Sequence, residues 1–260
     1  MTPPRLAVSV EDGIGRIRLI RPEAANTIDL QFAIELEAAA EACAVNGARA
    51  VLVTSTGKQF CGGGDLNSFA RERDIAEHLV SVTRHLHAGI TALVDMDAPL
   101  VMAVQGPAAG AGLGLVCAAD LVVAGRSATF LMAYTRLGVT PDGSSSWFLP
   151  AHVGLRRALE LTLTNRVLSS DEALSWGLVN RVVEDSSLLT EAEAIAAHLA
   201  SGPTSAYGQS ARLLRSAARA HLRHHLEDET NTLSERARHA DAQEGIAAFA
   251  ERRAARFTGA

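Results

Sequence analysis

The hydrophobic and polar positions in the first half of the chain change period several times, as in proteins that alternate strands with helices. Two short apolar runs, residues 6–10 and 14–20, flank Glu11-Asp12-Gly13 and predict a hairpin of two strands. Apolar residues between 30 and 43 then recur at helical spacing, and Gly47 supplies the left-handed residue that often follows a helix. The chain therefore opens with a strand hairpin followed by a helix.

The same alternation continues through the middle of the chain. The sequence predicts, in order, a buried strand at 50–53, a helix at 75–94, a strand at 100–104, a short helix after Gly110 and a strand at 121–124. Such alternation is typical of the α/β class.

The pattern becomes mainly helical from Leu155 onward. Ser169-Ser170-Asp171-Glu172 is a helix start signal, residues 178–183 are typical of one further strand, and the last quarter shows no strand pattern. We therefore expect an α/β core over residues 1–195. A helical region over residues 196–260 should follow it and pack against the core or a neighbouring subunit.

The longest uncharged segment, residues 98–119, is long enough to cross a bilayer of about 30 Å. Pro99, Pro107 and a series of glycines interrupt it, which favours a strand, a turn and a short buried helix over a membrane span. The first ten residues lack the basic stretch, apolar run and cleavage site of an export signal. We expect a cytoplasmic protein with no membrane partner.

Composition and charge exclude several classes of protein and partner. Of the 260 residues, 48% are hydrophobic and 20% charged, which is ordinary for a folded globular protein and excludes a disordered or fibrous chain. The net charge of -5 gives no electrostatic reason to bind polyanions, so we expect no nucleic acid partner. The cysteines lack Cys-x-x-Cys spacing and are too few for a disulfide framework, which fits a reducing compartment.

Two glycine-rich segments follow predicted strands, where their backbone amides can meet a ligand. The first is Phe60-Cys61-Gly62-Gly63-Gly64-Asp65-Leu66, and the second runs from Gly106 to Gly114 and opens the short helix. Successive glycines let the main chain approach a ligand closely, although the same composition also suits a flexible loop. Neither segment has the spacing of a nucleoside-triphosphate loop, and the second fits the dinucleotide fingerprint poorly.

These segments resemble those of the crotonase superfamily, also called the enoyl-CoA hydratase/isomerase family. The resemblance rests on the first glycine segment and on Ala103-Val104-Gln105-Gly106, which the glycine and alanine helix and Asp120 follow. Further motifs occur in the same order: Arg21-Pro22 with Asn26, Ser170-Asp171-Glu172-Ala173 with Gly177-Leu178-Val179, and Phe249-Ala250-Glu251-Arg252-Arg253 with Phe257. Together they extend over nearly the whole chain.

The resemblance implies a right-handed spiral of ββα units with a helical C-terminal oligomerisation region that builds trimers, commonly paired into hexamers. It also implies an acyl-CoA thioester substrate, no cofactor beyond the coenzyme A moiety of that substrate, and no metal. The thioester oxygen would lie between two backbone N–H groups, which by position belong to Gly64 and Ala111. Such donors stabilise the enolate formed when a proton leaves the carbon beside the thioester, and one donor is typically worth roughly 10²- to 10³-fold in rate.

Two positions depart from the hydratases of the family, which carry two glutamates that orient water and handle its proton. The matching residues here are Gly114 and Tyr134, and neither can act as a carboxylate. Because hydration needs both activation of water and protonation of the α-carbon, the loss of both glutamates argues against an ordinary hydratase.

A different carboxylate, Asp142, becomes the catalytic candidate. The segment from Leu137 to Ser144 resembles that of ring-1,2-epoxyphenylacetyl-CoA isomerases and 4-chlorobenzoyl-CoA dehalogenases, in which this Asp does the chemistry. Pro-Asp-Gly by itself is a common turn sequence. One carboxylate is sufficient for a double-bond shift, so we expect an acyl-CoA isomerase in which Asp142 moves the proton.

Three alternatives stay open. An enoyl-CoA hydratase or other crotonase-family lyase would use another acid/base set, such as Tyr134 with Asp142. A dehalogenase would use Asp142 as a nucleophile and would need a His base, for which His85 and His87 are candidates, although a His-x-His pair on a helix more often faces solvent. A catalytically silent protein would only bind acyl-CoA.

The resemblance also suggests which residues line the substrate site. They comprise the first glycine loop, two aromatic residues that could shape the acyl pocket, and residues near both termini that would meet coenzyme A. For the substrate these are Gly62, Gly63, Asp65, Leu66, Tyr134 and Trp147, and for coenzyme A they are Ala24, Phe249 and Arg252. Packing is the more common role for a residue such as Trp147, and exposure for Arg252.

Three further features are expected to matter less. Glu23 stands where relatives often have a basic residue, so its charge either weakens coenzyme A binding or points away. His221, His224 and His225 could suggest a metal site, but an exposed polar helix face explains them equally. Cys61 would need a lowered pKa to react, and we expect it to pack.

Overall fold

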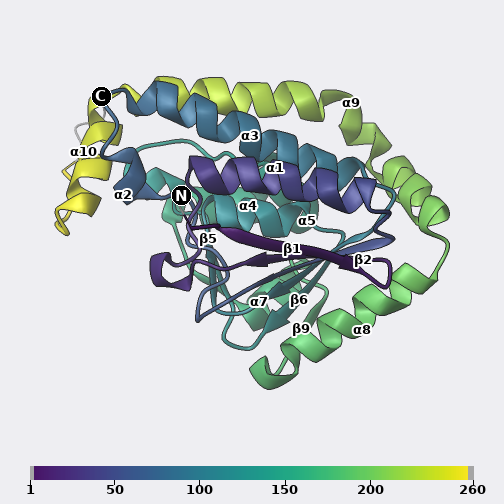
Figure 1. Cartoon of the computed structure of the whole chain (residues 1–260). Helices are drawn as coiled ribbons and strands as arrows, with labels where there is room; N and C mark the ends of the chain where they lie inside the picture. Colours follow the sequence, from purple (N-terminus) through teal and green to yellow (C-terminus); the bar gives the residue numbers. More distant parts are fainter. Residues whose placement is uncertain (1–2, 257–260) are drawn as a thin grey trace.

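The computed structural model describes residues 3–256, apart from the side chains of residues 216–223. Its largest sheet has the strand order β1-β2-β3-β4-β6-β9 (Figure 1). The β1–β2 hairpin is antiparallel and all other neighbouring strands are parallel. The strands are β1 (Leu6–Glu11), β2 (Ile14–Leu19), β3 (Ala50–Ser55), β4 (Leu100–Val104), β6 (Leu121–Gly125) and β9 (Arg181–Val183). The predicted strands are thus confirmed, except that the one expected over 178–183 begins only at Arg181.

A second, smaller sheet, which the sequence patterns do not predict, accompanies the first. It consists of β5 (Pro107–Ala109), β7 (Thr129–Leu131) and β8 (Leu168–Ser169), in that order. The chain alternates between the two sheets, since β4 leads into β5 and then α4 (Ala111–Ala118), and β6 leads into β7. This alternation is the repeated ββα arrangement of the crotonase fold.

Helices cover both faces of the large sheet, because alternate strand residues point to opposite sides. Leu52 and Val101 face α8 (Leu188–Ser201), which packs its alanines on them. Val51 and Val53 face a larger core on the other side, which includes α4 and the paired helices α1 (Leu30–Val45) and α3 (Ile75–Asp95).

The domain boundary expected between residues 195 and 196 falls inside α8. In this helix Ala192, Ala196 and Ala200 are all buried against the sheet. The whole of α8 therefore packs with the large sheet.

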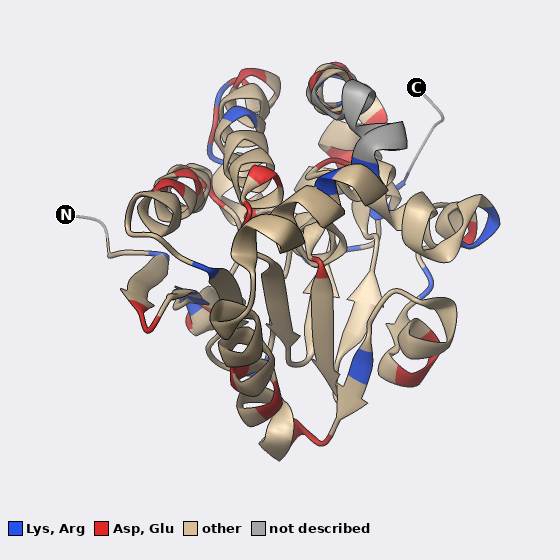
Figure 2. Cartoon of the chain, turned by 90° about the vertical axis from the view of Figure 1, so that its right-hand side faces the viewer, with Lys and Arg blue, Asp and Glu red and all other residues tan. Residues whose placement is uncertain are grey.

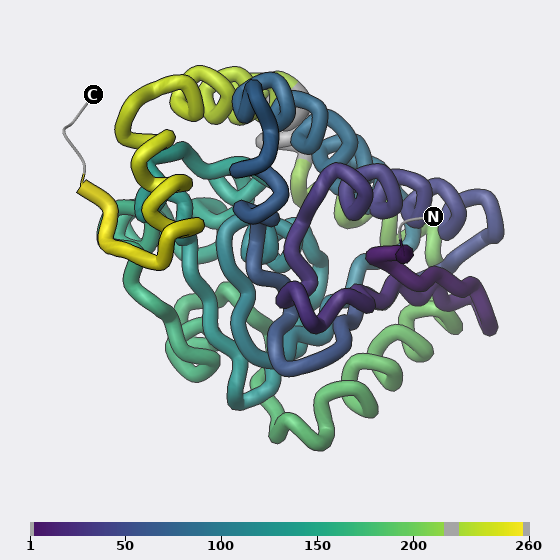
Figure 3. Tube along the Cα trace, turned by 60° about the vertical axis from the view of Figure 1, so that its left-hand side comes forward, coloured from purple at the N-terminus to yellow at the C-terminus, as the bar shows by residue number. Residues whose placement is uncertain are grey.

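The helical C-terminal region folds back over the core of its own chain. Helix α9 (Thr204–Ala237) runs along α3, and α10 (Ala240–Ala250) lies beside α2 (Leu66–Phe69) and the 3-10 turn Tyr134–Leu137 (Figures 1 and 3). Along the chain, α5 (Ser145–Val153), α6 (Leu155–Thr164) and α7 (Ser170–Trp176) come between β7 and β9. The C-terminal helices therefore lie beside segments that are far away in the sequence.

Local capping explains where two helices begin. The carboxylate of Asp29 accepts a hydrogen bond from the N–H of Phe32 at 2.8 Å and caps α1. Ser169 and Glu172 form a reciprocal capping box at the start of α7. The start of α7 agrees with the polar start signal in the sequence.

The uncharged segment 98–119 forms β4 and the wholly buried α4, as expected, with the short strand β5 where a turn is expected. None of the described helices combines the length and the apolar sequence that crossing a bilayer requires. Figure 2 shows acidic and basic residues interspersed over the helices and loops.

Candidate active site

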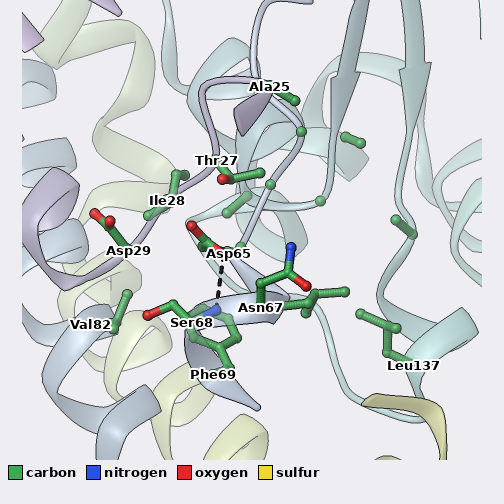
Figure 4. Close-up of a pocket in the computed structure, with 18 of the residues that line it drawn as sticks. Ala25, Thr27, Ile28, Asp29, Asp65, Asn67, Ser68, Phe69, Val82 and Leu137 are labelled. Atoms are coloured by element: carbon green, nitrogen blue, oxygen red, sulfur yellow. Dashed lines mark hydrogen bonds between the residues drawn. The ribbon is translucent and has the colours of Figure 1, made fainter. Parts of the chain in front are cut away.

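The two glycine-rich loops border a cavity of about 950 Å³. The N-terminal loop, α3, the segment before α5 and the C-terminal helices complete its wall, and Figure 4 shows part of it. Ten of the expected site residues line this cavity: Ala24, Gly62, Gly63, Gly64, Asp65, Leu66, Ala111, Tyr134, Asp142 and Phe249. The structure therefore brings together most of the residues that the sequence singled out.

Trp147 and Arg252 are the expected site residues that lie elsewhere. The indole of Trp147 packs on the ring of His225, with centroids 5.1 Å apart, and borders a separate cavity of about 270 Å³. Arg252 follows the end of α10 and is exposed to solvent. Trp147 therefore packs on α9 and is not among the described residues that line the main cavity.

Main-chain hydrogen bonds hold the two glycine loops against each other. The N–H of Cys61 donates to the carbonyl of Pro107 at 3.3 Å, and the N–H of Ala109 donates to the carbonyl of Cys61 at 2.9 Å. Gly63 has a φ of +87°, and a Cβ there would come within 3.0 Å of the carbonyl oxygen of Ala109. Only glycine fits this position without displacing the neighbouring loop.

The amide groups of Gly64 and Ala111 lie on these joined loops. In the part of the chain that the structure describes, neither N–H has a hydrogen-bond acceptor. Ala111 is the first residue of α4, so the helix dipole adds positive potential at its N–H. Two unpartnered donors at a cavity wall are suited to hold a developing negative charge.

Asp142 lies in the same wall with only 6% of its surface exposed. The hydroxyl of Tyr134 donates to its Oδ1 at 2.5 Å, while Oδ2 has no partner among the described residues. Burial raises the pKa of Asp142 to about 6, and the hydrogen bond from Tyr134 opposes that rise. Asp142 therefore keeps one free oxygen and a proton affinity suited to exchange near neutral pH.

Gly114, which the resemblance matches to a glutamate of the hydratases, faces the loop that carries Asp142. A Cβ on Gly114 would come closer than 3.0 Å to the carbonyl oxygen of Gly143. The backbone of this loop therefore fills the space that a side chain at position 114 would need.

Asp65 lines the cavity, but its carboxylate is engaged within the protein. One oxygen pairs with the guanidinium of Arg21, and the other accepts from the N–H of Ser68 at 3.0 Å (Figure 4). Arg21 in turn donates to Asp29 at 2.5 Å. This network joins the N-terminal loop to the residue directly after Gly64, so the carboxylate of Asp65 supports the loop.

The two candidate histidines of α3 differ in their surroundings. His85 is half-buried and its Nδ1 lies 2.6 Å from the carboxylate of Glu37. His87 is buried, accepts from the N–H of Gly143 at 3.3 Å and has its pKa lowered to about 4 by burial. Neither lines the cavity as the structure describes it.

Sequence reasoning missed Glu229, a buried residue of α9 directly behind the Asp142 loop. Its carboxylate accepts from the N–H of Ser144 at 3.0 Å. Glu227 and Asp228 beside it in sequence have exposed side chains, so the local pattern indicates a solvated helix face. No signal in the sequence distinguishes Glu229 from these neighbours.

Other reactive side chains offer no further site. Burial raises the pKa of Cys61 to about 12, and its thiol donates to the carbonyl of Asn26 at 3.1 Å, so it packs as expected. Among the residues described, no three His, Cys, Asp or Glu side chains gather in a way that could hold a metal ion. The side chain of His221 and all of Phe257 lie outside the described residues.

Comparison with known proteins agrees with this arrangement. The family model for enoyl-CoA hydratase/isomerase matches residues 9–260. The 1,2-epoxyphenylacetyl-CoA isomerase of Escherichia coli strain K12 is 35% identical over 257 residues, covering 96% of this chain and 97% of its own. The 4-chlorobenzoyl coenzyme A dehalogenase-2 of an Arthrobacter species is 39% identical over 206 residues, covering 77% of this chain and 75% of its own.

The crystal structure of an enoyl-CoA hydratase/isomerase from Pseudoalteromonas atlantica T6c superimposes with a TM-score of 0.87. It has 35% sequence identity and covers 98% of this chain and 100% of its own. The sequence match and the shared architecture extend over nearly the whole molecule. The chain therefore belongs to the enoyl-CoA hydratase/isomerase family.

Proposed function

We propose that the protein is an acyl-CoA isomerase that shifts a double bond by enolate chemistry, with Asp142 as the only proton carrier. The observation that carries this proposal is the placement of Asp142. It is a buried carboxylate with one free oxygen, in the cavity that the amides of Gly64 and Ala111 also border.

In the proposed reaction, the oxygen of a 3-enoyl thioester accepts hydrogen bonds from the N–H groups of Gly64 and Ala111. The free oxygen of Asp142 removes a proton from C2, and the electron pair moves into the enolate. The conjugated enolate then takes the same proton back at C4, so that the double bond ends between C2 and C3. Atoms balance, because the product has the mass of the substrate.

The pKa of Asp142 suits both halves of this exchange. With a pKa of about 6 the carboxylate is mostly ionised at neutral pH and can accept the proton. The resulting acid is weak enough to form and strong enough to return its proton to carbon. Tyr134 keeps Oδ1 occupied, which directs the exchange to Oδ2.

The cavity wall beyond Asp142 favours an apolar acyl group. Leu79, Val82 and Leu86 of α3 line one side of it. Leu233 of α9 and Ile246 of α10 add further apolar surface. We assign the acyl chain to this region and the coenzyme A moiety to the part of the wall that includes Ala24 and Phe249, where Glu23 also lies.

A hydratase is the less favoured alternative because Gly114 and Tyr134 stand at the two positions that match the glutamates of the family's hydratases, and neither is a carboxylate. Tyr134 would have to act as a second acid/base group beside Asp142, but burial and the negative charge of Asp142 raise its pKa well above the ordinary value. Its hydroxyl therefore stays protonated and serves as a donor to Asp142. The same geometry is compatible with a protein that binds acyl-CoA without turnover.

A dehalogenase-type reaction is a second candidate, favoured by His87 and by the similarity to the Arthrobacter protein. Burial holds His87 neutral, as a base must be, and its ring contacts the loop of Asp142. Its Nε2 already accepts from Gly143, so it would have to turn toward the cavity before it could activate water. We therefore rank this reaction below isomerisation.

A homo-oligomer, trimer or hexamer, remains part of the proposal. Helix α6 exposes Leu155, Leu159 and Leu163, which lie on one helical face. A mass measurement in solution tests this part independently of activity.

The decisive assay offers matched 3-enoyl-CoA and 2-enoyl-CoA to the wild type and to Asp142→Asn, with products followed by mass and absorbance. We expect conversion of the 3-enoyl to the 2-enoyl thioester without a mass change, and a loss of at least about 10²-fold in the variant. Asp171→Asn, at an exposed position, is the matched control. Gain of water, loss of halide from an aromatic thioester, or full activity of Asp142→Asn would contradict the proposal.

A further inference from the structure

The loop that carries Asp142 adopts a backbone conformation that needs support. Gly143 and Ser144 both have positive φ, +60° and +66°, and Ser144 is fully buried. A left-handed conformation is ordinary for glycine but costly for serine. Something outside the loop must therefore stabilise this geometry.

Helix α5, which begins at Ser145, lacks the usual cap from its own chain segment. The side chain of Ser144, its N-cap residue, makes no capping hydrogen bond. The first amides of a helix need acceptors, and a negative charge is favourable there. In this protein the acceptor comes from α9, far away in the sequence.

The carboxylate of Glu229 supplies this cap. Its Oε2 accepts from the N–H of Ser144 at 3.0 Å, and its Oε1 accepts from the N–H of Ser146 at 3.3 Å. The hydroxyl of Ser146 also bonds to Oε1 and lies 2.7 Å from Nε2 of His225. Since this hydroxyl has one proton, it donates to an ionised Glu229 and accepts from His225.

We propose that Glu229 is a positioning residue that holds the Asp142 loop in its reactive geometry through the N-terminus of α5. This inference rests on the proposed role of Asp142. Glu229 does not line the cavity as described, so it acts through the loop and not on the substrate. The C-terminal region thereby takes part in building the active site of its own chain.

The groups around Glu229 set its charge. His87 on α3 has Nε2 3.6 Å away and stays neutral, and His225 on α9 has a lowered pKa through burial. Asp142, in the supported loop, repels the negative charge of Glu229. Tyr134 also interacts electrostatically with Glu229. Burial and Asp142 together raise the pKa of Glu229 to about 7, while its hydrogen bonds from α5 oppose the rise.

Two buried carboxyl groups that interact titrate as a pair. Asp142 must be ionised to accept the proton, and the ionised form of Glu229 accepts more strongly from the α5 amides. We therefore expect kcat/KM of the wild type to fall at low pH, on the acidic limb of its pH profile, as two protons bind. In a variant in which residue 229 cannot ionise, the acidic limb should reflect the binding of one proton.

The test compares wild type, Glu229→Gln and Glu227→Gln. Glu227 lies on the same helix with an exposed side chain, so its variant is the matched control. We expect Glu229→Gln to lower kcat by about tenfold or more with KM within about twofold, and to reduce the acidic limb to one proton. Amide hydrogen exchange of residues 143–148 should become at least about tenfold faster, since the cap is weakened.

A second variant tests the same contact if Glu229→Gln fails to fold. Ser146→Ala removes one hydrogen bond to Glu229 and leaves both backbone N–H groups in place, so it should show the same changes more weakly. Unchanged exchange in residues 143–148 together with an unchanged pH profile would overturn the role of Glu229. If Asp142→Asn is fully active, the proposed function fails, while the exchange measurement still decides whether Glu229 supports the loop.

Discussion

Gly114 and Gly143 approach each other so closely that a Cβ on Gly114 would lie within 3.0 Å of the carbonyl oxygen of Gly143. The position that the resemblance matches to a glutamate of the hydratases is therefore sterically linked to the position of the Asp142 loop. A side chain at 114 and this loop geometry exclude each other.

Introducing a glutamate at Gly114 should not produce a hydratase. The new side chain would displace the Gly143 backbone, and inserting even small groups into packed interiors costs about 1–3 kcal/mol. We expect Gly114→Glu to lose more than about 3 kcal/mol of unfolding free energy and most of the proposed isomerase activity. Thermal unfolding and product mass would check this, with Val45→Glu at the exposed end of α1 as the control. A stable variant that adds water to 2-enoyl-CoA would contradict the steric argument.

Tyr134→Phe should move the acidic limb of kcat/KM toward higher pH. The Tyr134 hydroxyl stabilises the ionised form of Asp142, so its removal lets burial raise the Asp142 pKa above about 6. A hydrogen bond to a charged group is worth about 1.5–3 kcal/mol, which corresponds to a displacement of the limb by about one pH unit or more. Tyr207→Phe is the control, because Tyr207 lies at the start of α9 and is not among the described residues that line the cavity. A limb at the wild-type position would show that the hydroxyl does not control Asp142.

Ala111→Pro should distinguish the effect of the backbone N–H from that of the side chain at the proposed oxyanion site. Proline is tolerated at the first position of a helix, so α4 can still form, but the residue no longer has an N–H. We expect kcat to fall about 10²- to 10³-fold. Ala111→Gly keeps the N–H and should retain activity within about tenfold. Equal activity of the two variants would exclude this amide as an oxyanion donor.

The stability contribution of Asp142 should decrease as pH rises. Its pKa is raised from 3.8 to about 6 in the folded protein, so between these values the native state binds more protons than the unfolded state. The contribution is therefore most favourable below about pH 4 and falls by up to about 3 kcal/mol toward pH 6. The difference in unfolding free energy between wild type and Asp142→Asn isolates this effect from other groups. A difference that stays constant or rises with pH would show that Asp142 is not held in a buried environment.

The strand hairpin, the helices α1 and α3, and the buried strands follow from local sequence, because period and capping signals lie within each segment. The second sheet does not, since β5, β7 and β8 are two to three residues long and too short to show a period. Local sequence also does not show that α8 packs as one helix on the sheet, because its buried alanines contact strands that are far away in the chain.

The candidate site also combines features that local sequence predicts with features that only the tertiary structure decides. The glycine loops and Asp142 are recognisable in the sequence because backbone approach and turn formation restrict residue type locally. Whether Asp142 is a turn residue or a buried base depends on Tyr134 and on helices packed over it. Likewise, the role of Glu229 depends on α9 lying against the loop before α5. Sequence determines local conformation and ligand-facing backbone, whereas burial and the resulting pKa arise only when distant segments exclude water from the same place.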